Sequence, residues 1–141
     1  MAEDAGFLKE LRLRAHAKPE AAALLAPGRE ALTYGELWGQ VDALASALRS
    51  AGLRRSDAVA VVMPDGPEMI ALCLGVVGTA ACAPLNPAFS EPEFQFYLHD
   101  LGARALIVQT GLSPAAEAAA RSLGIEVWKA TAASNRKAGV P

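Results

Sequence analysis

The sequence contains few of the residues from which metal and disulfide sites are built. Two cysteines and two histidines occur among 141 residues. Cys73 and Cys82 lie nine positions apart, a spacing that matches neither a CxxC redox motif nor a zinc knuckle. Because apolar residues surround both, we expect them to be buried free thiols. Free thiols are typical of a reducing compartment, so the expected location is cytoplasmic.

The sequence also lacks a concentration of positive charge. Thirteen basic residues stand against 15 acidic ones, which gives a net charge of -2 and a pI near 5.7. The one basic cluster, residues 9–14, fits the polar side of a short helix. Without a basic patch there is little attraction for phosphate backbones, so we expect no nucleic acid partner. The first residues carry two acids and no apolar run of the signal-peptide type.

Charged residues are absent from one long stretch, residues 69–90. This length raises the question of a membrane span, but Gly75, Pro84 and Pro87 interrupt the stretch. Its helical part comprises only about 12–14 residues, short of the roughly 20 that a bilayer requires. We therefore expect no transmembrane segment, and instead a buried helix followed by a buried strand.

Size and composition favour a single globular unit. Hydrophobic residues make up 52% of the chain, and a domain of this length buries about 68% of its unfolded surface. Residues 130–141 are polar and small, which is typical of a linker or a frayed end. The expected organisation is one α/β subdomain over residues 1–129, followed by that linker.

Two capping boxes mark the starts of helices. Thr33 and Glu36 form a T-x-x-E box before an apolar stripe that Gly52 ends. Ser90 and Glu93 repeat the arrangement as S-x-x-E. With their caps, the predicted helices comprise residues 6–17, 33–52, 67–79, 90–102 and 113–123.

Two of these helices are predicted to be deeply buried. Residues 68–79 are apolar nearly all round, so they should be covered on more than one side. In the next helix, the predicted inward face consists of Phe94, Tyr97, Leu98 and Leu101.

Short apolar runs between the helices predict strands. Residues 58–64 form a continuous β-branched run, the pattern of a parallel strand covered on both faces. The other predicted strands are residues 81–85, 105–108 and 125–128, with a small hairpin over residues 22–33. Strands that alternate with helices through short loops specify right-handed crossovers. The predicted fold class is α/β, with three layers and a mainly parallel sheet that has helices on both faces.

Candidate ligand positions follow from this sheet. In open α/β sheets ligands bind beyond the carboxyl ends of the strands, here residues 64–66, 85–87 and 109–111. Asp65 could be a metal-binding or phospho-acceptor carboxylate. The further acids and the lysine of a receiver domain are not evident, however, so a turn or helix-cap role fits Asp65 better.

Other ligand-binding motifs are missing or misplaced. Neither GxGxxG nor GxxxxGK[ST] occurs, and Gly75 and Gly78 fall inside a helix, where they are expected to permit close packing. His16 and His99 lie on predicted helices without a Cys or Asp partner at catalytic spacing. His99 beside Asp100 could form a surface hydrogen bond.

Several phrases, taken in order, resemble the AMP-forming adenylating enzymes. That superfamily includes acyl-CoA synthetases, aryl-CoA ligases, luciferases and nonribosomal peptide adenylation domains. The phrases LTYGEL, RRSDAVAVVMP, LGVVGTAACAPLNP and DLGARALIV all fall within residues 32–108. APLNPAF followed by SEPEFQFYL looks closer to the acyl- and aryl-CoA ligase branch than to peptide synthetases. The resemblance implies that the chain forms part of the large N-terminal domain of an acyl-CoA synthetase-like fold.

The resemblance implies a two-step reaction in a longer parent protein. A carboxylate attacks the α-phosphate of MgATP to give an acyl-adenylate and pyrophosphate, and the thiol of coenzyme A then displaces AMP. The family's Ser/Thr/Gly-rich P-K-G loop, aromatic-Thr-Glu motif, T-G-D motif and late lysine are all missing here, and Lys129 and Lys137 match none of their contexts. Residues 33–36 and 85–87 correspond to scaffold motifs. No catalytic, cofactor-binding or metal-binding residue is therefore assigned to this chain, although ATP, Mg²⁺ and coenzyme A are implied for the parent.

The sequence thus predicts the N-terminal fragment of an acyl-CoA synthetase-like ligase of fatty acid metabolism, inactive by itself. Its expected partners are the rest of the parent polypeptide and a carboxylic acid substrate. Alone, the fragment should expose apolar surface, through which it could form a homodimer. The alternative is a free-standing, doubly wound ligand-binding or regulatory module without enzymatic activity. Such a module would have polar helix faces and a ligand near Asp65 or Asn86.

Overall fold

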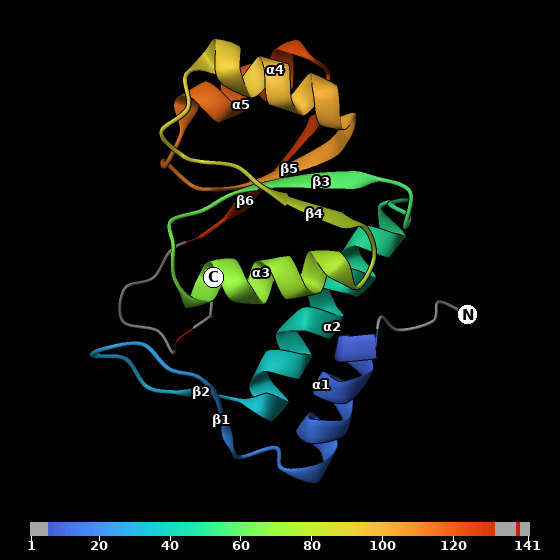
Figure 1. Cartoon of the computed structure of the whole chain (residues 1–141), viewed down its shortest axis with the longest axis vertical. Helices are drawn as coiled ribbons and strands as arrows, with labels where there is room; N and C mark the ends of the chain where they lie inside the picture. Colours follow the sequence, from blue (N-terminus) through green and yellow to red (C-terminus); the bar gives the residue numbers. More distant parts are fainter. Residues whose placement is uncertain (1–5, 132–137, 139–141) are drawn as a thin grey trace.

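A four-stranded parallel sheet lies at the centre of the computed structural model, which describes residues 6–131 and Ala138 (Figure 1). The strand order is β4-β3-β5-β6, and each neighbouring pair is parallel. The strands are β3 (Ala58–Val62), β4 (Ala81–Pro84), β5 (Ala103–Gln109) and β6 (Glu126–Ala130). This arrangement confirms the predicted parallel sheet.

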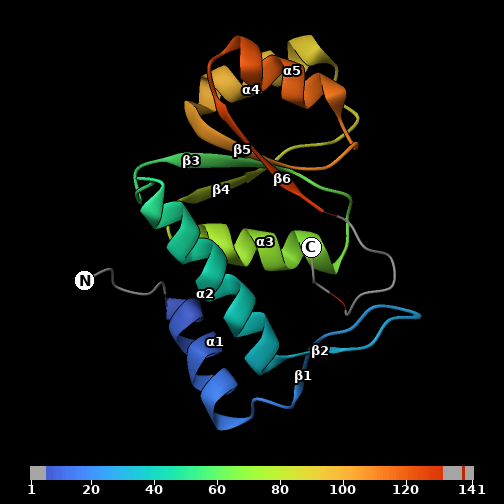
Figure 2. The ribbon, with the colours of Figure 1, turned by 180° about the vertical axis from the view of Figure 1, so that it is seen from behind.

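Helices cover both faces of the sheet, as Figures 1 and 2 show. One face carries α4 (Glu91–Leu101) and α5 (Pro114–Ser122), and the other carries α3 (Pro67–Val77). In β3, Val59 and Val61 pack into the core on the α3 side, while Ala60 and Val62 pack into the core beneath α4 and α5. Because successive side chains of a strand point to opposite faces, a strand covered on both sides is apolar throughout.

A helical hairpin extends the molecule beyond α3. It consists of α1 (Gly6–Ala17) and α2 (Tyr34–Ser50), joined by an antiparallel pair of short strands, β1 (Ala22–Leu24) and β2 (Leu32–Thr33). One buried cluster joins these elements to α3. It consists of Leu8, Leu11, Leu32, Leu37 and Val41 from these elements and Ala71 from α3. The third helix therefore lies between α2 and the sheet, which confirms the prediction that it is covered on more than one side.

The helix termini follow the predicted capping residues with one exception. Thr33 Oγ1 accepts a hydrogen bond from the Glu36 N–H at 3.2 Å, and Glu36 Oε2 accepts one from the Thr33 N–H at 2.9 Å, so this capping box is complete. At α4, Ser90 Oγ accepts from the Glu93 N–H at 3.4 Å, but the reciprocal bond that completes a box is not part of this cap. Glu93 is exposed, so water can solvate its carboxylate instead.

The predicted burial is wrong for β4 and for part of α4. β4 lies at an edge of the sheet, so Ala81 and Pro84 are exposed where a buried strand was expected. On α4, Phe94 and Leu98 are fully buried, whereas Tyr97 and Leu101 are 38% and 39% exposed. Residues four apart share one helix face, and the sheet covers only the narrow stripe that Phe94 and Leu98 occupy.

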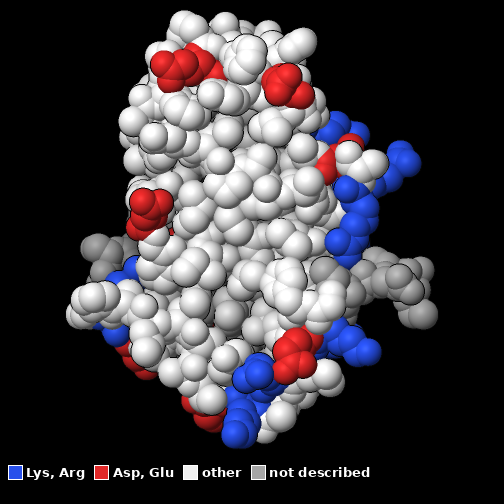
Figure 3. Space-filling model, in the orientation of Figure 1, with Lys and Arg blue, Asp and Glu red and all other residues white. Residues whose placement is uncertain are grey.

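The surface over α3 and β4 carries little charge. In the view of Figure 1, Lys, Arg, Asp and Glu side chains lie mainly around the periphery of this face (Figure 3). The uncharged stretch of residues 69–90 contributes α3 and β4 to it. No helix in the described part of the chain is long and apolar enough to cross a membrane.

The chain after β6 is described only in part. β6 continues through Ala130, which pairs with Gln109 of β5. Most of the expected linker, including Lys137, lies outside the described residues. Ala138 is buried, and its N–H donates a hydrogen bond to the Glu30 carbonyl oxygen at 3.0 Å.

Candidate functional site

The strand order places a change of winding direction between β3 and β5. From β3 the chain crosses through α3 to β4 on one side, and it then returns through α4 to β5 on the other side. In doubly wound sheets, ligands bind at the carboxyl ends of the strands beside such a switch. The structure thus brings residues 64–66 and 109–111 together at the carboxyl ends of the central strands β3 and β5. Residues 85–87 lie at the carboxyl end of the neighbouring strand β4.

Two polar side chains at these strand ends form hydrogen bonds with backbone groups. Asn86 Oδ1 accepts a hydrogen bond from the Ala88 N–H at 2.9 Å, which closes an Asx turn. Thr110 Oγ1 donates to the Ala130 carbonyl oxygen at 3.2 Å. Asp65 is exposed in the bend before α3, where Gly66 occupies the N-cap position without a side-chain capping bond. Asp65 therefore serves in the turn rather than as the helix cap.

The other titratable candidates do not converge. His16 is exposed on α1 and His99 is exposed on α4, and these helices lie at opposite ends of the molecule (Figure 1). Among the described residues, no three His, Cys, Asp or Glu side chains are placed to hold a metal ion.

Gly75 inside α3 and Gly78 at its C-cap permit close packing, as predicted. A Cβ atom on Gly75 would lie 2.6 Å from Leu44 Cδ2 and 2.9 Å from Leu44 Cβ. A Cβ atom on Gly78 would lie 3.1 Å from Ala45 Cβ. Both glycines thus let α3 approach α2 closely, and neither lies in a nucleotide-binding loop.

The cysteines differ from the prediction that they are buried. Both are free, and both are half-buried at the surface between α3 and β4. A hydrogen bond from Cys82 lowers the pKa of the Cys73 thiol to about 7, although burial opposes that shift. The same hydrogen bond, together with burial, raises the pKa of Cys82. The prediction was wrong because β4, as an edge strand, does not have the neighbouring strand that would cover Cys82.

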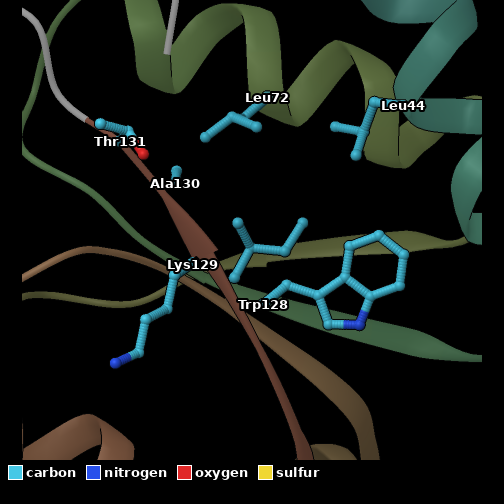
Figure 4. A pocket seen from close by; sticks show the side chains of 7 residues that line it. Leu44, Leu72, Trp128, Lys129, Ala130 and Thr131 are labelled. Atoms are coloured by element: carbon cyan, nitrogen blue, oxygen red, sulfur yellow. The ribbon is translucent and has the colours of Figure 1, made fainter.

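A cavity of about 370 Å³ lies on the α3 side of the sheet, beside β6 (Figure 4). Trp128 Nε1 is buried here, without a hydrogen-bond partner in the described part of the chain. Lys129 points to the opposite side of β6, where its Nζ lies 3.1 Å from Glu117 Oε1. The residues that line the cavity are Leu44, Leu72, Ile107, Trp128, Lys129, Ala130 and Thr131.

Sequence reasoning missed this cavity, because its walls come from α2, α3 and two strands that are separated in the sequence. The only local signal was a large aromatic residue, Trp128, near the end of a strand. Lys129 forms an ion pair with Glu117 on α5.

Comparisons with known proteins agree with the architecture. The family described as AMP-binding enzyme matches residues 11–138. The chain is 37% identical over 106 residues to the oxalate–CoA ligase of Arabidopsis thaliana, an alignment that covers 73% of this chain and 21% of that ligase. It is 30% identical over 110 residues to the long-chain-fatty-acid–CoA ligase FadD13 of Mycobacterium tuberculosis, which covers 77% of this chain and 22% of FadD13.

A solved structure gives the same result. The N-terminal domain of FACL13 from Mycobacterium tuberculosis superposes with a TM-score of 0.75 at 26% identity, over 93% of this chain and 34% of that domain. The chain thus spans about a fifth of the length of the curated ligases that it matches. It belongs to the AMP-binding enzyme family and corresponds to the N-terminal portion of the acyl-CoA ligase fold.

Proposed function

We propose that the chain is the N-terminal part of a cytoplasmic carboxylic acid–CoA ligase that converts ATP, a carboxylic acid and coenzyme A into acyl-CoA, AMP and pyrophosphate. The observation that carries the proposal is the family match over residues 11–138. The named relatives join oxalate or long-chain fatty acids to coenzyme A, and the second of these supports a place in fatty acid metabolism. The partner of this chain is then the remainder of the ligase polypeptide.

In this proposal the chain provides scaffold rather than chemistry. Adenylyl transfer requires cationic and amide donors around the phosphate oxygens and a bound metal ion. At the carboxyl edge of the sheet, Asn86 and Thr110 already bond backbone groups, and Lys129 is paired with Glu117. These partners support a scaffold role, and we assign the nucleotide chemistry to other segments of the ligase.

The first test uses the 141-residue chain by itself. Titration with MgATP in a calorimeter should give only the heat of dilution, because the described residues supply no acid cluster for the metal. Intact Arabidopsis oxalate–CoA ligase, titrated in the same buffer, controls for the sensitivity of the measurement. A saturable one-to-one isotherm with the isolated chain would contradict the scaffold role and favour a self-contained ligand-binding module.

The second test asks whether this chain can replace its counterpart. In the Arabidopsis oxalate–CoA ligase, the 106 aligned residues are exchanged for the matching residues of this chain. Because a scaffold does not contact the reacting atoms, oxalate-dependent pyrophosphate release should stay within about tenfold of the parent rate, a change of about 1.4 kcal/mol in the barrier. The preference for oxalate should also be unchanged.

The exchange needs a folding control. Its melting temperature and circular dichroism spectrum are compared with those of the parent ligase, and a variant from which the segment is deleted serves as the inactive reference. A chimera that melts like the parent but releases no pyrophosphate would contradict the proposal, since a folded scaffold would then be insufficient.

A further inference from the structure

The outer face of α4 carries two aromatic side chains between two carboxylates. Glu93, Phe96, Tyr97 and Asp100 follow one another at intervals of three, one and three residues, so they share one face of the helix. All four are exposed, and Phe96 and Tyr97 keep 64% and 38% of their surface accessible to water. Large apolar side chains that stay exposed side by side are typical of a surface that contacts another protein.

Contacts that lead into the core hold these rings in place. The Tyr97 ring stacks on the Phe89 ring, with the centroids 5.0 Å apart and an angle of 16° between the planes. The Phe89 ring in turn lies edge-on to the buried ring of Phe94. The Phe96 ring lies edge-on to the Tyr97 ring, with the centroids 5.3 Å apart. A partner that contacts these rings therefore has little side-chain freedom to remove, which lowers the entropic cost of binding.

The charge around the rings is negative. The helix α4 contains three carboxylates and no Lys or Arg. The basic residues of the elements that follow, Arg104 of β5 and Arg121 of α5, form ion pairs with acids outside α4. At the upper end of the view in Figure 3, where Figure 1 places α4 and α5, acidic side chains are visible and basic ones are not. The carboxylates of Glu93 and Asp100 thus have no Lys or Arg partner in the described part of the chain.

We propose that this face of α4 binds an amphipathic helix of a protein partner, in which arginines at positions i and i+7 flank apolar residues at i+3 and i+4. A guanidinium group fits both features of the face, because it bonds carboxylates in a bidentate manner and stacks on aromatic rings. Seven residues of α-helix rise about 10.5 Å, so the two arginines have the same separation as Glu93 and Asp100. The apolar residues between them then cover Phe96 and Tyr97. This proposal does not depend on the ligase function.

The test uses a synthetic peptide with this pattern, fluorescein-KAARAALLAARAAK-amide. Its fluorescence anisotropy is followed as the 141-residue chain is added, and we expect saturable binding. Binding should weaken about tenfold when NaCl is raised from about 0.05 M to about 0.5 M, because salt screens ion pairs. A second peptide, in which glutamine replaces both arginines, should also bind about tenfold more weakly. Equal binding of the two peptides, or no saturable binding of the first, would overturn the proposal.

Substitutions in the chain locate the binding face. Phe96→Ala should weaken binding about tenfold, because it removes the more exposed ring. Glu93→Gln combined with Asp100→Asn keeps the shape of the face and should have an effect of about the same size. The matched control is Phe7→Ala, since Phe7 is 47% exposed on α1 at the opposite end of the molecule (Figure 1). Its affinity should equal that of the unmutated chain. Circular dichroism establishes that each variant is folded, and an equal loss of affinity in Phe7→Ala and Phe96→Ala would contradict the assigned face.

Sedimentation velocity without peptide tests whether a second copy of the chain covers this face instead. The unmutated chain and Phe96→Ala should have the same sedimentation coefficient at every concentration, because the face is reserved for a different partner. A dimer of the unmutated chain that Phe96→Ala dissociates would show that the face binds its own copy, and it would overturn the proposal.

Discussion

Replacement of Phe94 by alanine should lower the free energy of unfolding by about 3–5 kcal/mol. Phe94 is completely buried between α4, α5 and the sheet, and its ring lies edge-on to Phe89 with the ring centroids 5.7 Å apart. The substitution removes apolar contact and leaves a cavity that the surrounding side chains fill only in part. Because domains are stable by about 5–15 kcal/mol, this loss is a large fraction of the total. Urea denaturation followed by circular dichroism measures it.

The same helix provides the matched control. Phe96 lies two residues further on and is 64% exposed, so Phe96→Ala should change stability by no more than about 0.5 kcal/mol. Both substitutions remove the same ring from the same helix, and they differ mainly in burial. Equal urea midpoints for the two variants would show that the inward face of α4 is assigned wrongly.

Replacement of Gly75 by alanine should destabilise the chain by about 1–2 kcal/mol, although alanine favours helices by about 1 kcal/mol over glycine. The added methyl group would lie 2.9 Å from Leu44 Cβ. That atom is attached to the backbone of α2, so rotation of the Leu44 side chain cannot remove this contact. The two helices must separate, and this loss of packing exceeds the gain in helix propensity. Urea denaturation again gives the value.

Gly39→Ala is the control for this substitution. Gly39 is also inside a helix, α2, but a Cβ atom there meets nothing within 4 Å. The alanine should therefore stabilise the chain by about 0.5–1 kcal/mol. As a second check, Gly75→Ala combined with Leu44→Ala should cost less than the sum of the single changes, because the smaller side chain leaves room for the methyl group. Additive effects would show that the two positions are not in contact.

Much of the fold could be predicted because its determinants are local. Thr33 caps α2 through bonds to a residue three positions away, and Gly102 ends α4 with a φ of 60° that favours glycine. The alternation of strands with helices is likewise visible in the sequence, and it is sufficient to predict a parallel sheet with helices on both faces. The ordered sequence motifs within residues 32–108 were sufficient to predict the family.

The errors in strand burial arose where strands far apart in the sequence become neighbours. Burial of β4 depends on whether another strand lies beside it, and the apolar run of residues 81–85 does not contain that information. For the same reason, the prediction that Cys82 is buried was wrong. The cavity beside Trp128 could not be predicted either, because it requires the position of Leu44 on α2 relative to β6.

The central position of β3 has a consequence during synthesis on the ribosome. Its neighbour β4 begins 19 residues after Val62 (81 − 62), whereas β5 begins 41 residues after it (103 − 62). At about 5–20 residues per second, β3 waits roughly 2–8 s for its second neighbour. Throughout that interval one side of an entirely apolar strand has unsatisfied backbone groups, which makes it a site for premature association with other chains. The length of chain between β3 and β5, which contains α3, β4 and α4, thus sets how long the nascent protein needs protection.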